Sequence, residues 1–83
     1  MTHTNFLLFR ISVKRSFLAN EAAANLKRFL HEEKKNCGLQ ILAFSENPLS
    51  ATVAIPQDKK HDLRIALNLF SAETAIHWTL ETE

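Results

Sequence analysis

Few residues of this 83-residue chain have the types and the spacing that metal or catalytic chemistry requires. His31-Glu32-Glu33 begins like the zinc motif H-E-x-x-H, but Lys35 stands where the second histidine would be. Cys37 is the only cysteine, so no C-x-x-C pair exists. The other histidines are scattered along the chain at His3, His61 and His77. We therefore predict no metal site and no catalytic residue.

Asp58 and Asp62 are two carboxylates whose spacing suits a shared site. They lie four residues apart beside His61, and on a helix such residues are neighbours. A metal-dependent enzyme using these three residues is one hypothesis. The same run is typical of a solvated helix start in which Asp58 caps the first turn, and we favour that interpretation.

Gly38 is the only glycine, and this excludes the common phosphate-binding loops. A Walker A loop, a G-x-G-x-x-G turn and a G-x-S-x-G nucleophile elbow each need at least two glycines. Nucleotide binding through these loops is therefore excluded. We expect no cofactor, and we favour a non-catalytic function over an enzymatic one.

Composition and charge predict one globular domain over residues 1–83. The hydrophobic share is 46% and the formal net charge is +1, so overall charge requires neither nucleic acid nor a membrane as partner. No apolar run approaches the ~20 residues of a membrane helix. The single cysteine fits a reducing compartment, and we expect a cytoplasmic protein. We interpret Cys37 as a small apolar residue at a helix end, where the helix dipole raises the thiol pKa.

The clearest element is a helix over residues 16–38. Its apolar residues fall on one stripe at helical spacing. They are Ala19, Ala22, Ala23, Leu26, Phe29 and Leu30. Lys34 and Lys35 suit the negative end of the helix dipole, and Gly38 suits a left-handed cap. Such a helix must bury its stripe against another layer.

Segments 5–15, 39–45, 50–55 and 75–81 are predicted strands, and residues 46–49 are a predicted turn. In the first strand the residues expected to face the helix are Leu7, Phe9, Ile11 and Val13. In the last strand Ile76, Trp78 and Leu80 alternate with more polar residues.

Residues 59–72 decide between two folds. Apolar and polar residues alternate over 62–70, as in a strand, but His61, Arg64, Asn68 and Ser71 gather in one polar sector of a helical wheel. We favour a helix. The order is then β-α-β-β-α-β, a two-layer α+β fold with a four-stranded antiparallel sheet and both helices on one face, the ferredoxin-like plait. The alternative is β-α-β-β-β-β, a cystatin-like meander around a single helix.

The uncovered face of this sheet is the predicted functional surface. If the odd-numbered residues of the first strand face the helix, Phe6, Leu8 and Arg10 face outward. Depending on register, Leu42 and Phe44 join them. Exposed apolar clusters commonly mark interfaces. We therefore predict a small regulatory protein, comparable in size to inhibitors, antitoxins or immunity proteins. It would bind a protein partner or form a homodimer through this face or an edge strand.

Nucleic-acid binding is the alternative function. Arg10, Lys14 and Arg15 form a basic end of the first strand, and phosphate contacts need such cations. A dimer of plaits with weak metal-dependent nuclease activity would belong to this alternative. The predicted third strand carries no aromatic residue on which a base would stack.

Overall fold

The computed structural model describes residues 5–13, 19–46 and 49–82. The elements follow in the order β1 (Phe6–Val13), α1 (Ala19–Asn36), β2 (Gln40–Glu46), β3 (Leu49–Pro56), a short 3-10 turn (Gln57–Lys59), α2 (Lys60–Thr74) and β4 (Trp78–Thr82). The predicted residues Lys14, Arg15 and Ser16, and the centre of the predicted turn, lie outside these ranges.

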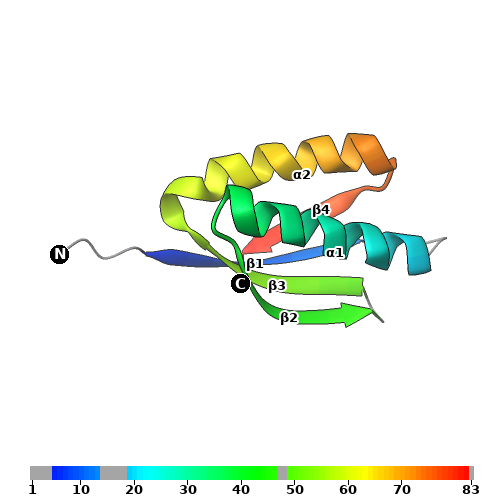
Figure 1. Ribbon diagram of the computed structural model, residues 1–83, viewed down its shortest axis with the longest axis horizontal. Coiled ribbons are helices and arrows are strands. Elements are labelled where there is room, and N and C mark those ends of the chain that lie inside the picture. The colour runs from blue at the N-terminus through cyan, green and yellow to red at the C-terminus, as the bar shows by residue number, and fades with distance from the viewer. Residues whose placement is uncertain (1–4, 14–18, 47–48, 83) are drawn as a thin grey trace.

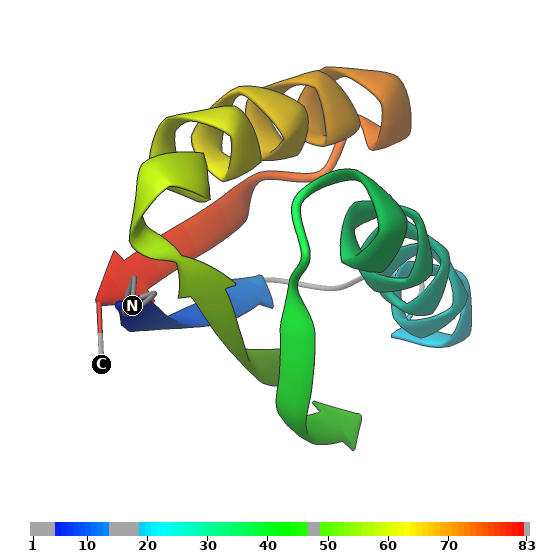
Figure 2. The same cartoon turned by 60° about the vertical axis from the view of Figure 1, so that its left-hand side comes forward.

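The four strands form one antiparallel sheet in the order β2-β3-β1-β4. Both helices cover the same face of it, with α1 on the β2 side and α2 on the β4 side (Figure 1, Figure 2). In the described part of the chain, no element covers the second face. The predicted α+β class, with a four-stranded antiparallel sheet and two helices, is confirmed.

Residues 60–74 are helical, so the alternative of a strand over 62–70 is wrong. Leu63, Leu67 and Phe70 are buried, and their spacing of four and three residues is that of a helix face. Asp58 does not cap this helix. It lies in the preceding 3-10 turn, and the cap residue Lys59 makes no side-chain cap bond.

The core lies between the helices and the sheet, and the predicted faces supply it. On β1, Phe9 and Ile11 are fully buried, and Leu7 and Val13 pack against the core at its margin. From α1, the predicted stripe is buried at Ala22, Ala23, Leu26, Phe29 and Leu30. The central strand β3 adds Val53 and Ile55.

Residues with positive φ stand just beyond both helices. Gly38 has φ 71° and Ala75 has φ 57°. The left-handed conformation of Ala75 caps α2, so the predicted strand start at residue 75 is wrong, because a cap reverses the chain there. The last strand begins at Trp78.

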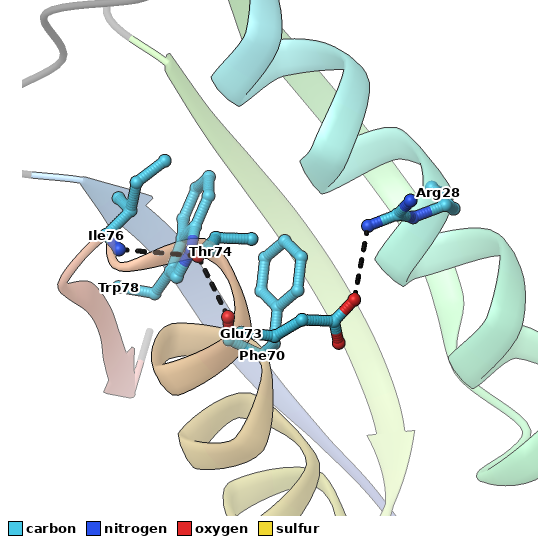
Figure 3. Close-up of polar contacts among 6 residues, drawn as sticks. All are labelled: Arg28, Phe70, Glu73, Thr74, Ile76 and Trp78. Carbon is cyan, nitrogen blue, oxygen red and sulfur yellow. Dashed lines mark hydrogen bonds and ion pairs between the residues drawn. The ribbon is translucent and has the colours of Figure 1, made fainter.

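An aromatic column joins α1, α2 and β4. The ring of Phe70 stacks on Phe29 at 4.6 Å and on Trp78 at 5.0 Å between centroids. Beside it, the Thr74 hydroxyl donates to the Phe70 carbonyl oxygen and accepts from Trp78 Nε1 at 3.1 Å and from the Ile76 backbone N–H (Figure 3). This end of α2 is therefore fixed both by stacking and by hydrogen bonds.

Candidate interaction surfaces

Phe6 and Leu8 lie on the uncovered face of the sheet, as predicted. Their side chains are 46% and 44% exposed. Phe6 pairs with Pro56, and Leu8 pairs with Ala54 on β3. We name Phe6, Leu8, Leu42 and Pro56 the open-face patch. It lies on a face that carries no described helix, as Figure 2 shows.

A bulge in β2 separates Leu42 from Phe44. The pairing of β2 with β3 shifts between Ile41, which pairs with Val53, and Ala43, which pairs with Thr52, so Leu42 is an extra residue without a paired residue on β3. Leu42 is 54% exposed. We include it in the open-face patch because it stands at the bulge next to Ala43, which pairs with the open-face residue Thr52. Phe44 pairs with the core residue Ala51 and packs against the core. The placement of Phe44 on the open face is therefore wrong, because the extra residue reverses the alternation.

Arg10 lies on the same face, between Thr52 of β3 and Glu81 of β4. Its side chain is exposed. Lys14 and Arg15, the other two residues of the predicted nucleic-acid site, lie outside the described residues. Phe6 is the only aromatic side chain among the described residues of this face, so base stacking has little support here. Nucleic-acid binding stays an untested prediction.

One end of the open face is rich in hydroxyl groups. Ser12 pairs with Ser50 on one side and with Thr79 on the other. The Thr79 hydroxyl is buried and has no hydrogen-bond partner among the described residues. The open face thus has an apolar end at Phe6, Leu8 and Pro56 and a hydroxyl-rich end at Ser12, Ser50 and Thr79.

A second surface lies between α1 and the edge strand β2. Its floor consists of Leu30, Ile41 and Phe44, and its rim carries Lys27, His31 and Lys34 from α1. The cavity volume of this α1–β2 groove is about 350 Å³. Lys27 Nζ lies 5.3 Å from the centre of the Phe44 ring and 3.1 Å from Glu46 Oε1. This groove was not predicted from the sequence. The spacing of four and three residues between Lys27, His31 and Lys34 does indicate that they lie on one side of a helix.

The two helices form a third hollow, which is crossed by an ion pair. Arg28 of α1 lies 3.6 Å from Glu73 of α2 (Figure 3). The exposed Leu69, together with Glu32 and Glu33, also lines it. Leu69 is 66% exposed, which the sequence did not predict, because α2 has more apolar surface than its contact with the sheet buries.

Glu33 is buried at the inner wall of this hollow, with 7% of its surface exposed. Its Oε2 accepts a hydrogen bond from Cys37 Sγ at 3.0 Å. Burial first, and then this hydrogen bond, raise the pKa of the Cys37 thiol to about 12. The predicted direction of the shift is confirmed, but burial and Glu33 account for it. Such a thiol is protonated near neutral pH and is a poor nucleophile.

The described residues bring no three metal-ligating side chains together. Asp62 lies 3.8 Å from Lys59 Nζ in an ion pair within the first turn of α2. The hypothesis of a metal-dependent site at Asp58, His61 and Asp62 thus gains no support in the described structure. Of the helices described, none is long and apolar enough to cross a membrane.

Comparison with models of protein families, with curated proteins and with solved structures finds no match.

Proposed function

We propose that this chain is a small non-catalytic regulatory protein that binds a protein partner, or a second copy of itself, through the open-face patch. The proposal includes a cytoplasmic location, because the lone cysteine fits a reducing compartment.

We also propose that the fold is a ferredoxin-like plait. The element order and the strand order β2-β3-β1-β4 support this. In such a two-layer arrangement the helices leave one face of the sheet uncovered. Whether that face contacts water or a partner depends on how apolar its side chains are.

The observation that carries the functional proposal is the exposure of Phe6, Leu8 and Leu42 on a sheet face that has no described cover. Single exposed apolar residues are normal on protein surfaces. Strand β3 lies between the strands of Leu8 and Leu42, and there it carries the small residues Ala54 and Thr52. The larger side chains of Leu8 and Leu42 therefore project beyond their neighbours on β3. Apolar side chains gathered on one face are typical of protein interfaces.

The substitution Leu8→Asp tests this proposal, because it puts a charge at the centre of the patch without removing core volume. The matched control is Leu69→Asp on α2, which changes an even more exposed leucine on another surface. Light scattering over a range of protein concentrations measures self-association, and affinity capture with a tagged chain measures partner retention. Circular dichroism establishes that both variants are folded.

We expect Leu8→Asp to abolish dimerisation, or to release a protein that the wild type and Leu69→Asp retain. A buried charge at an interface costs several kcal/mol, enough to break such a complex. A chain that is monomeric at every concentration, and whose captured proteins are the same with and without Leu8→Asp, contradicts the proposal.

A further inference from the structure

The α1–β2 groove combines an apolar floor with a basic rim. Leu30 is fully buried at its base, whereas Ile41 is 45% exposed and therefore presents apolar surface to an incoming group. Lys27, His31 and Lys34 stand along the helix at intervals of four and three residues, so they line one side of α1.

The residues of α1 that line its two hollows differ in charge. The side toward α2 carries Glu32 and Glu33 beside the Arg28–Glu73 ion pair. The side toward β2 has no carboxylate among the residues that line the groove. Lys27 is paired with Glu46 at one end, and no ion pair within the described residues involves Lys34 at the other. An occupant with negative charge near Lys34 is therefore favoured.

The floor favours a polypeptide over a nucleic acid. Lys27 Nζ stands over the Phe44 ring, so that ring face is not open for a base to stack on. The edge strand β2 has no neighbour on its outer side in the described structure, and its backbone groups suit main-chain pairing with an extended peptide. The exposed Ile41 matches an aliphatic side chain.

We propose that the α1–β2 groove binds an acidic, extended protein segment, with an aliphatic side chain against Ile41 and with carboxylates beside His31 and Lys34. This surface is separate from the open-face patch, so the inference goes beyond the function proposed above. The chain would then have two binding surfaces on opposite faces of its sheet.

The test uses fluorescence anisotropy of a labelled peptide of about nine residues in which Leu or Val alternates with Asp or Glu, since side chains of a strand alternate. We expect saturable binding that weakens as salt rises from about 50 to about 300 mM, because exposed charges are screened. Lys34→Glu and Ile41→Asp should each weaken binding about fivefold or more.

Two control variants isolate the contribution of the groove to peptide binding. Lys60→Glu reverses an exposed charge on α2 and should leave binding unchanged. Leu8→Asp should also leave peptide binding unchanged. The proposal for the open-face patch and the proposal for the groove can therefore fail independently of each other. The full chain is used throughout, and circular dichroism verifies that each variant is folded.

Three results would overturn the inference. One is equal binding of a peptide in which Lys replaces every acidic residue. Another is tighter binding of a single-stranded oligonucleotide of similar length than of the acidic peptide, which would assign the basic rim to phosphates. The third is an acidic peptide whose binding does not saturate by about 1 mM or is insensitive to Lys34→Glu and Ile41→Asp.

Discussion

Cys37 and Glu33 form a buried pair where α1 ends, and the pair makes stability depend on pH. The Cys37 thiol has a pKa of about 12 in the folded chain against 9.0 for an unperturbed thiol. The folded state therefore keeps a proton that the unfolded state loses above pH 9. Stability is fully present below pH 9 and falls as the pH rises from there toward 12.

We expect the free energy of unfolding of the wild type to fall relative to that of Cys37→Ser by up to about 1.4 kcal/mol per pH unit above pH 9. Serine keeps a hydroxyl donor for Glu33 and does not ionise in this range. Urea unfolding of both proteins between pH 8 and pH 10.5 measures the difference, because other ionising groups are shared. Parallel curves for the two proteins would show that the thiol is not held in its neutral form.

The same substitution at two threonines should change the free energy of unfolding differently. Thr74→Val removes the acceptor of the buried Trp78 Nε1–H and should lower the free energy of unfolding by about 1–3 kcal/mol. Thr79→Val removes a buried hydroxyl that has no partner among the described residues and should be neutral or stabilising. Thermal unfolding of the two variants compares them directly, and a larger loss for Thr79→Val would contradict this expectation.

At the scale of elements, a residue with positive φ follows each helix within two residues of its end, but only one of these residues is a glycine. The left-handed conformation costs an alanine roughly 1–2 kcal/mol, and Ala75→Gly removes that cost. Glycine also gives the unfolded chain more conformational freedom, which offsets ~0.4–1 kcal/mol of the gain. The net effect of Ala75→Gly should therefore be stabilising. Gly38→Ala should destabilise it by about 1 kcal/mol.

The cost at Gly38 should be conformational, because an added Cβ would lie 3.7 Å from the nearest Pro56 side-chain atom, an ordinary contact. Chemical denaturation of the two variants gives the sign of each change. A stabilising Gly38→Ala or a destabilising Ala75→Gly would show that the caps do not control the helix ends in this way.

Periodicity predicted the elements and their inner faces. The stripe of α1 and the alternation of β1 are properties of local spacing, so the sequence contains them directly. The placement of Phe44 failed because a bulge depends on the pairing partner, which no local pattern specifies. The burial of Glu33 escaped prediction for a similar reason, since it depends on where α2 lies. The outward placement of Phe6 and Leu8 followed from the alternation of β1, whereas that of Leu42 depended on the register of β2. The groove required the approach of α1 to β2.

At the scale of the whole molecule, the two proposed surfaces lie on opposite faces of one sheet. The open-face patch is built on β1, β3 and the bulge of β2, and the groove is built on α1 and the other side of β2. Substitutions at well-separated sites with no shared partner usually have additive effects. We therefore expect a variant that carries both Leu8→Asp and Lys34→Glu to combine the two losses. Light scattering should show the same loss of association as Leu8→Asp alone, and peptide anisotropy should show the same loss of binding as Lys34→Glu alone.

The burial of Trp78 has a practical consequence for spectroscopy. The chain has one tryptophan and no tyrosine, so its intrinsic emission comes from a single indole, enclosed by Phe70 and tied to Thr74. A red shift of that emission reports water entering the end of α2. Because β4 and β2 are opposite edges of the sheet, an intact signal during titration at the groove would distinguish ligand occupancy from partial unfolding.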